Sequence, residues 1–221
     1  MTATITATNL TATQAKALGP WSAGWPEPVE VKLGPVPLEA QPSAYVQAAW
    51  KDRPYGTTPS ARVSAATTGD RLLLRVEWQA ESPRTAITDN NVFADACGAL
   101  FPANGQNAPL ATMGNEAEPV ISWYWRAGTD TPFVGEARGL GTVSRRASHT
   151  LSAAAAWASG KWAVVFQHPL GDAGLKAAAG SSIPAAFAVW SGAANERAGL
   201  AAYSPEWLEI TIPAGRGGAA R

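Results

Sequence analysis

The sequence predicts an all-β protein built as a single-domain antiparallel β-sandwich with short helical turns. Apolar runs of strand length recur from Trp21 onward, and Gly, Pro, Asn and Asp separate them. No run of about ten or more residues combines helix caps with a 3.6-residue period. The chain has 221 residues, a length that all-β sandwiches often reach in one domain. We therefore expect one domain over 21–213, an extended or flexible arm at 1–20 and a flexible tail at 214–221.

The expected strands are rich in β-branched and aromatic residues. They are Val29–Leu38 (interrupted at Gly34-Pro35), a hairpin over Ala61–Gln79 that turns at Thr68-Gly69-Asp70, and then Val120–Ala127, Lys161–Leu170, Ile183–Gly192 and Trp207–Pro213. A helical turn is expected around Ala153–Ala156, with a turn and a wide loop as the alternative. Two packed antiparallel sheets would accommodate this many short strands.

Charge and hydropathy exclude several classes of partner. The 17 basic and 17 acidic residues cancel, and the absence of a long basic run argues against binding nucleic acid or an anionic membrane. No apolar run approaches the roughly 20 residues of a membrane span. Only 15% of residues are charged, below the usual quarter or so, so small residues or a partner must cover much of the surface.

Sulfur chemistry is limited by a single cysteine, Cys97. It excludes an intrachain disulfide, covalent c-type haem attachment, and zinc or iron–sulfur sites built from several cysteines of this chain. The sequence also lacks a Gly-x-Ser-x-Gly elbow, a Walker loop and a dinucleotide-binding glycine motif. Catalysis by this chain alone is therefore not expected.

Met113 is the one methionine after the initiator. It lies between turn-forming stretches and just before a Trp-Tyr-Trp strand, whereas core methionines usually fill gaps in larger numbers. A thioether is a soft ligand that favours ferrous haem and raises its potential. Met113 is therefore a candidate axial ligand of a haem iron.

Trp123 and Trp125 alternate with Tyr124, so both indoles fall on one face of the expected strand. They serve either as a platform for a planar ligand, such as a sugar or porphyrin, or as part of the sandwich core. Asp95 either hydrogen-bonds a loop or faces a ligand, and the small residues at 96–98 admit either a flat ligand or a tight contact between sheets. His149 and His168 give weak support for a metal site, although His168 closes a strand at the rim of a sheet.

Four segments together resemble a known family. They are FADACGALFP, the TMG turn followed by PVISWYWRA, WAVVFQHPL and PAAFAVWSGAANERAGLAAYSPEW. Their types and order resemble the haem b-binding gamma subunits of ethylbenzene, dimethylsulfide and steroid C25 dehydrogenases, of chlorate and selenate reductases, and of the related nitrite oxidoreductase. The resemblance covers about Trp21 to Trp207.

The resemblance implies a β-sandwich related to DOMON and carbohydrate-binding domains. It also implies one non-covalent haem b with methionine and lysine as axial ligands, and electron exchange with an iron–sulfur beta subunit that connects to a molybdenum-bis-pterin alpha subunit. Met113 matches the methionine of the family. Beside it, the expected cofactor-binding residues are Asp95, Trp123, Trp125 and Phe187.

The expected lysine is missing. After Asn195-Glu196-Arg197, Gly199 is followed by Leu200 and Ala201, and no lysine occurs after Lys176. His168 is the expected substitute as second axial ligand, since neutral imidazole binds haem iron well. Lys161 and Lys176 are the alternatives, and so are a five-coordinate iron and a site that binds no haem.

We therefore expect an electron-transfer subunit of a molybdenum oxidoreductase, not catalytic by itself. The alternative is a haem-free binding or structural module whose tryptophans stack on sugars. The resemblance implies a periplasmic location, and because the N-terminus does not read as a secretory signal, export with a partner is expected. A cytoplasmic location is the alternative.

Overall fold

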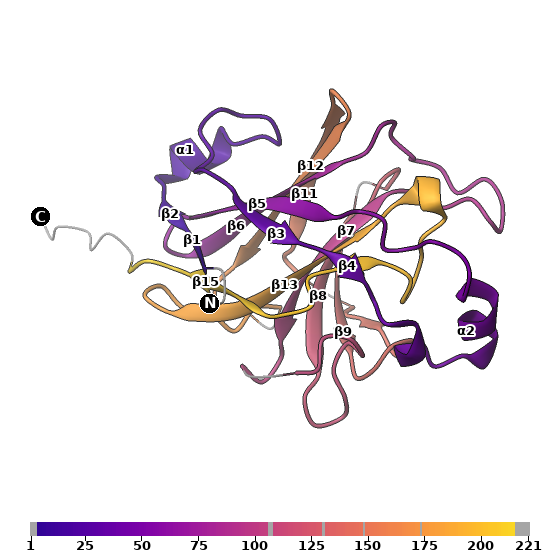
Figure 1. The fold of residues 1–221 in the computed structure, drawn as a ribbon. Helices are drawn as coiled ribbons and strands as arrows, with labels where there is room; N and C mark the ends of the chain where they lie inside the picture. The colour runs from indigo at the N-terminus through magenta and orange to yellow at the C-terminus, as the bar shows by residue number, and fades with distance from the viewer. Residues whose placement is uncertain (1–3, 106–107, 130, 148, 173, 215–221) are drawn as a thin grey trace, which may run out of the picture.

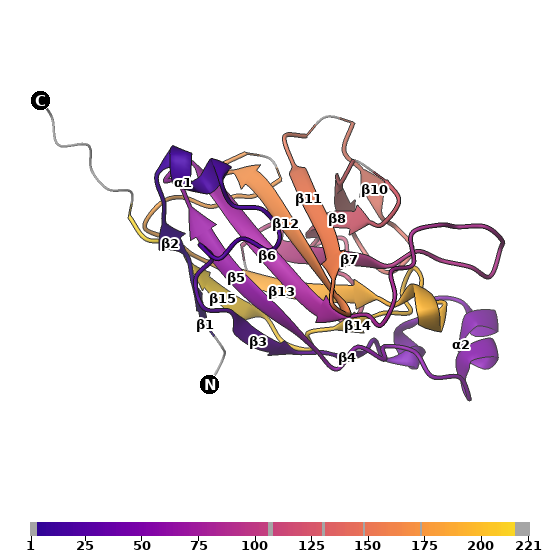
Figure 2. The same ribbon diagram turned by 90° about the horizontal axis from the view of Figure 1, so that it is seen from above.

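Two β-sheets lie face to face in a computed structural model that describes residues 4–105, 108–129, 131–147, 149–172 and 174–214. Within this part of the chain one sheet has nine strands and the other six, and Figures 1 and 2 show the two layers from the side and from above. The strands of the larger sheet are β1 Thr4–Thr6, β4 Gly34–Pro35, β7 Ala96–Pro102, β8 Val120–Arg126, β9 Phe133–Ala137, β10 Ser144–Arg145, β13 Ser182–Trp190, β14 Ala202–Tyr203 and β15 Leu208–Thr211. Those of the smaller sheet are β2 Thr8–Asn9, β3 Val29–Lys32, β5 Ser60–Thr67, β6 Arg71–Gln79, β11 Ser152–Ala158 and β12 Lys161–Pro169.

The helical content is small, as the sequence predicts. Two short helices and two 3₁₀ turns occur among the described residues: α1 Ala12–Lys16, α2 Ala44–Trp50, η1 Leu38–Ala40 and η2 Gly192–Ala194. Both α-helices begin at a hydroxyl N-cap, Thr11 for α1 and Ser43 for α2, because such side chains satisfy a free amide of the first turn. Neither helix is long or apolar enough to cross a membrane.

The all-β sandwich is confirmed, and the expected strands occur within a few residues of their predicted ends. In the larger sheet the main path runs β1-β15-β13-β7-β8-β9-β10, and in the smaller one it runs β11-β12-β6-β5-β2. The hairpin of β5 and β6 and the pairing of β6 with β12 are antiparallel. Alternating apolar residues and turn-forming dipeptides were therefore sufficient to locate these elements.

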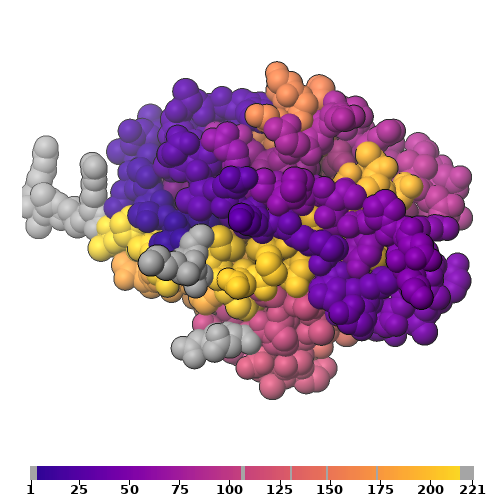
Figure 3. Space-filling model, viewed as in Figure 1, coloured from indigo at the N-terminus to yellow at the C-terminus, as the bar shows by residue number. Residues whose placement is uncertain are grey.

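One local prediction is wrong, and the structure adds detail to another. The helical turn expected around Ala153–Ala156 is instead part of β11, which pairs antiparallel with β12. The segment expected as an N-terminal arm is paired with both sheets: β1 lies parallel to β15 and β2 parallel to β5. Figure 3 shows this N-terminal segment, in indigo, against the yellow C-terminal strand. In both segments, backbone pairing with another strand determines the structure. Local composition does not reveal such pairing.

The space between the sheets is filled mainly by aromatic and aliphatic side chains. Trp78 of β6, Trp125 of β8 and Trp162 of β12 form one cluster, with ring centroids 5.1 to 6.4 Å apart. Trp123 lies 4.7 Å from the ring of Phe101 and is fully buried. Aromatic side chains bury large areas and favour such tilted contacts, so these tryptophans hold the two sheets together.

Asp95 joins the two sheets through a buried carboxylate. One carboxylate oxygen accepts hydrogen bonds from the Arg84 amide at 2.8 Å and the Trp162 indole at 2.9 Å. The other accepts from the Gly192 amide at 2.8 Å. Trp162 belongs to the six-stranded sheet, whereas Asp95 precedes β7 of the nine-stranded sheet. The side chain, 2% exposed, therefore ties a loop, a strand end and the opposite sheet to one point.

Asp95→Ala should lower the free energy of unfolding by about 3 kcal/mol, because it leaves three donors, two of them buried, without an acceptor. Urea unfolding followed by tryptophan fluorescence measures this change. The exposed Asp52→Ala provides the matched control and should leave the midpoint almost unchanged. Equal midpoints for both variants would contradict the assigned role of Asp95.

Candidate functional site

A cavity of about 410 Å³ lies on the outer face of the nine-stranded sheet, away from the core between the sheets. Its size is within the range of small-molecule and cofactor sites. Its lining residues come from five strands and the loops around them: Gly98, Leu100, Met113, Ser122, Tyr124, Arg126, Thr129, Thr131, Phe133, Leu140, Gly141, Val143, Arg145, Trp190, Ala198 and Gly199.

Strand alternation explains the floor of the cavity. Side chains of a strand point to opposite faces in turn, so along β8 Trp123 and Trp125 enter the core while Tyr124 faces the cavity. The same alternation on β13 buries Val189 in the core and presents Trp190 to the cavity. One face of the nine-stranded sheet thus packs in the core, and the other lines the cavity.

Aromatic rings form one wall of this cavity. The Tyr124 ring lies 4.9 Å from that of Phe133 and 5.3 Å from that of Trp190, centroid to centroid. The Trp190 indole donates a hydrogen bond to the Ala198 carbonyl at 2.9 Å. A Cβ on Gly98 would lie 3.7 Å from the Trp190 ring and 3.1 Å from the Trp123 carbonyl. Glycine at 98 therefore lets the aromatic wall lie close to β7.

Arg126 and Arg145 give the cavity a positive charge. No Asp or Glu is among the described residues that line it. The Arg145 guanidinium lies 4.1 Å above the centre of the Phe133 ring, a contact that orients a cation without neutralising it. Guanidinium groups bind carboxylates with charge-assisted hydrogen bonds, so the cavity suits a largely apolar molecule that carries acidic groups.

Met113 enters the cavity from a strained loop. Its φ is +57°, a left-handed conformation that residues other than glycine rarely adopt. The loop is held by its own backbone: the Met113 amide donates to the Leu110 carbonyl, the Gly114 amide donates to the Pro109 carbonyl, and the Gly139 amide donates to the Met113 carbonyl. Several contacts thus enforce an unfavourable conformation, which is typical of functional loops.

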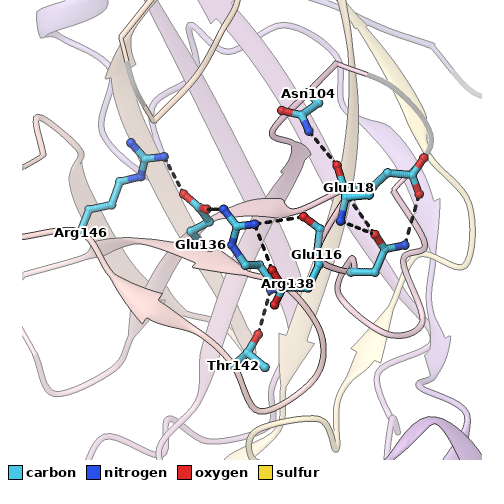
Figure 4. Close-up of polar contacts among 9 residues, drawn as sticks. Asn104, Glu116, Glu118, Glu136, Arg138, Thr142 and Arg146 are labelled. Carbon is cyan, nitrogen blue, oxygen red and sulfur yellow. Dashed lines mark hydrogen bonds and ion pairs between the residues drawn. The ribbon is translucent and has the colours of Figure 1, made fainter.

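Ion pairs fasten the turn after Met113 to the end of β9. Figure 4 shows Arg138 reaching Glu116, and its guanidinium donates to the Glu116 carbonyl oxygen at 3.0 Å. The same side chain pairs with Glu136 at 2.9 Å, and Glu136 also pairs with Arg146 at 3.0 Å. These ion pairs are partly exposed, so they add little to the free energy of unfolding. Their main effect is to fix the position of the loop.

The loop at 198–199 forms another wall and is also fixed. Gln41 donates to the Gly199 carbonyl at 2.8 Å. Glu196, 1% exposed, accepts hydrogen bonds from the amides of Thr57 and Ser191. These contacts hold Ala198 and Gly199 in the cavity wall. Alanine contributes only a methyl group to this wall, and glycine has no side chain.

Most of the cofactor-binding residues predicted from the sequence lie elsewhere. Trp123, Trp125 and Phe187 belong to the core between the sheets, and Asp95 forms the clamp described above. Because Trp123 is fully buried and Trp125 is 6% exposed, neither indole is free to stack on a sugar. Of that set, Met113 alone lines the cavity among the described residues.

His168 is also placed in the core and does not line the cavity of Met113. Its ring stacks on Trp123 at 5.2 Å between centroids, and its Nδ1 lies 2.8 Å from the Pro169 carbonyl. Trp123 and Tyr124 point to opposite faces of the nine-stranded sheet. The His168 ring, which stacks on Trp123, therefore lies on the opposite side of that sheet from Tyr124. The structure therefore does not bring together the two residues predicted as axial ligands.

The two alternative lysines are also absent from this cavity. Lys176 lines a different cavity of about 200 Å³, beside Arg138 and Arg146. Lys161 begins β12 in the other sheet, where it pairs with Gln79. His149 is exposed. Among the described residues, no three His, Cys, Asp or Glu side chains gather as a metal site.

The sequence missed Tyr124, Trp190 and the two arginines. One feature pointed to Tyr124: a residue between two inward-facing tryptophans must face outward. Nothing local marked Arg145 or Phe133, because their contact depends on the pairing of β9 with β10. The cavity offers a thioether, an aromatic wall and two cations, which together fit a planar dianionic iron porphyrin.

Three subunits of reductases or dehydrogenases are similar to this chain in sequence. A proposed respiratory nitrate reductase haem subunit of Haloferax mediterranei is 30% identical over 206 residues, covering 84% of this chain and 74% of that protein. The chlorate reductase gamma subunit of Ideonella dechloratans is 31% identical over 156 residues, 69% of this chain and 65% of that one. The dimethylsulfide dehydrogenase gamma subunit of Rhodovulum sulfidophilum is 29% identical over 155 residues, 66% and 58%. The chain thus spans less than two thirds of the last two.

Solved structures support the fold. A proposed carbohydrate-binding protein of Bacteroides uniformis aligns with a TM-score of 0.55 and 13% identity, over 96% of this chain and all of that one. A family 9 carbohydrate-binding module of Caldicellulosiruptor kristjanssonii, in complex with glucose, aligns with a TM-score of 0.50 and 10% identity, over 99% of both chains. No protein-family model matches the chain.

Gly114→Ala should disturb the Met113 loop. Gly114 has φ +82°, and an added Cβ would lie 2.5 Å from the Glu118 carbonyl oxygen. Gly105→Ala is the matched control, because Gly105 has φ +87° but open space around it. Both changes cost about 1–2 kcal/mol in left-handed strain, and Gly114→Ala should cost a further 1–3 kcal/mol or so from the clash. Urea unfolding checks the difference; equal losses would disprove it.

His168 should make stability depend on pH. Burial lowers its pKa below the usual value, partly opposed by the Pro169 carbonyl and Asp172. The unfolded chain therefore takes up a proton first as pH falls, so stability is full above about pH 6.5 and declines towards the folded pKa. His168→Gln should flatten this decline in urea midpoints between pH 7.5 and pH 5, whereas His149→Gln should not. The same slope in all three proteins would exclude His168 as the cause.

Proposed function

Because the chain belongs to the family of gamma and haem subunits of nitrate reductase, chlorate reductase and dimethylsulfide dehydrogenase, we propose that it is an electron-transfer subunit. In this proposal it binds one non-covalent haem b in the cavity that Met113 lines. The names of the relatives identify subunits of reductases and dehydrogenases, and one of them is named for haem.

The combination of groups in the cavity is the observation that carries this proposal. A thioether, three aromatic rings and two arginines line one cavity, with no carboxylate among the described residues there. An iron porphyrin has an apolar ring, a metal that accepts soft ligands and two carboxylate side chains. Each of these parts finds a chemically matched partner in this cavity.

Each residue has a separate role in this proposal. Met113 would hold the iron through its thioether, which favours the ferrous state. Arg126 and Arg145 would bind the propionates as charge-assisted partners. Tyr124, Phe133 and Trp190 would bury the porphyrin face and keep water from it, which lowers the local dielectric and further shifts the potential.

A bound haem supplies reversible one-electron chemistry at its iron. The residues of this chain orient the ring, exclude water and set the relative stability of the two oxidation states. No described residue needs to move a proton in this role. Electron transfer to another subunit then requires only a close approach between cofactors.

The proposed partners are an iron–sulfur beta subunit and, through it, a molybdenum-bis-pterin alpha subunit. The relatives' names as gamma subunits of chlorate reductase and dimethylsulfide dehydrogenase support a multi-subunit assembly. A surface with few charges is also suited to permanent contact with other subunits. We propose the periplasm as the location, with the cytoplasm as the alternative.

Reconstitution with haem tests the proposed function. The purified chain should take up one equivalent of haem b, counted by the pyridine haemochrome method, and its reduced spectrum should show Soret and alpha bands. Met113→Ala should lower the reduction potential, because the ferrous state loses its thioether ligand. A chain that takes up no haem, or Met113→Ala with an unchanged spectrum and potential, would contradict the proposal.

The arginines provide a second test. Arg126→Gln and Arg145→Gln should each weaken haem binding by about tenfold, the equivalent of 1.4 kcal/mol or so for one charge-assisted hydrogen bond. Arg53→Gln is the control, because Arg53 lines a different cavity. Fluorescence quenching of tryptophan by haem measures the three affinities. Equal affinities would place the carboxylates of the ligand elsewhere.

A further inference from the structure

Few side chains of the cavity carry an atom that binds iron strongly. The strong protein ligands of haem iron are imidazole, thiolate, thioether, amine and phenolate groups. Among the described lining residues, Met113 supplies a thioether and Tyr124 a phenol, while Ser122, Thr129 and Thr131 carry hydroxyl groups. No lysine, histidine or cysteine is among the described residues that line the cavity.

Residues outside the described ranges add one thioether, that of Met1, to this inventory and no imidazole, amine or thiolate side chain. By sequence they are Met, Thr, Ala, Gln, Asn, Asp, Ser, Arg and Gly, without lysine, histidine or cysteine. Cys97 faces the core between the sheets, as does His168. The sandwich would therefore have to open before either of these two side chains could reach the cavity.

The wall at Ala198 and Gly199 is rigid and short. The Ala198 carbonyl accepts a hydrogen bond from the Trp190 indole, and the Gly199 carbonyl accepts one from the side-chain amide of Gln41. The next residues, Leu200 and Ala201, are 3% and 2% exposed. This wall lines the cavity with a methyl group and a glycine, and its hydrogen bonds hold the neighbouring side chains in the interior.

Tyr124 is the remaining candidate ligand, and its environment argues against that role. Burial raises the pKa of its phenol to about 12, so forming the phenolate that would bind iron costs more here than for an exposed tyrosine. A neutral phenol is a much weaker donor to iron than a phenolate. Ring contacts with Phe133 and Trp190 hold the side chain within the aromatic wall.

We infer that iron held in this cavity has one side-chain ligand, Met113, and that its second axial position is open to small external donors such as carbon monoxide or imidazole. The wall at Ala198 and Gly199 is where a ligand side chain is missing. This inference rests on the proposed haem binding. In a subunit with two side-chain ligands, a small molecule would first have to displace one of them.

Carbon monoxide provides the probe. The full chain is reconstituted with haem b, the haem is counted, and the ferrous protein is titrated with carbon monoxide while the Soret band is recorded. We expect one equivalent to bind and the Soret band to shift. A chain that holds a full equivalent of haem but shows no shift would overturn the inference and leave haem binding intact. A chain that takes up no haem would overturn both.

Placing a ligand at the short wall tests its assignment. In A198K the new amine should occupy the iron and reduce the apparent affinity for carbon monoxide by about tenfold or more, because only the fraction with a free position binds. A193K adds the same charge at an exposed residue outside the cavity and should match the wild type. Equal affinities in the two variants would overturn the assignment of this wall.

Tyr124→Phe separates the remaining alternative. Because phenylalanine keeps the ring that would cover the porphyrin face, the variant should still bind one equivalent of carbon monoxide if the phenol is not a ligand, with any change in affinity smaller than that of A198K. If the wild type binds no carbon monoxide and Tyr124→Phe does, the phenol is the second ligand and the inference is wrong. The wild-type titration decides the main point even if A198K takes up less haem.

Discussion

The alternation of side chains along β8 is the constraint on which both the core and the cavity depend. Trp123 and Trp125 must enter the core because the smaller sheet covers that face, and Tyr124 must then face the cavity. A register shift of one residue would place the indoles outside and the phenol inside. One strand thus sets the packing between the sheets and the aromatic wall of the candidate haem site.

The cavity is assembled from loops that the sandwich holds in place. The Met113 loop is tied to the end of β9 through Gly139 and Arg138, and the wall at Ala198 is tied to Trp190. Such contacts allow the left-handed backbone at Met113, which would be unfavourable alone. A side chain that binds a metal works best when its position is fixed before the metal arrives. The loop gives the Met113 thioether such a fixed position.

Buried carboxylates illustrate how a polar group can be structural in a protein of this kind. Asp95 attracts attention in the sequence as a ligand candidate, yet its oxygens accept three protein donors. Glu196 joins the loop after β13 to Thr57 in the same way. Both acids place the strand ends around the cavity without lining it. Local sequence cannot separate these roles, because partners distant in the chain satisfy the same oxygens.

The sequence by itself determined the sandwich class and the main strands and made Met113 a candidate ligand, because period-two patterns, turn residues and a lone thioether are local features. Only the tertiary structure decided which face of each strand is covered. It placed His168 and the paired tryptophans in the core, and brought Tyr124, Arg145 and Ala198 together with Met113. Those outcomes depend on which strands pair and which sheet covers them, and strand pairing is a long-range property of the chain.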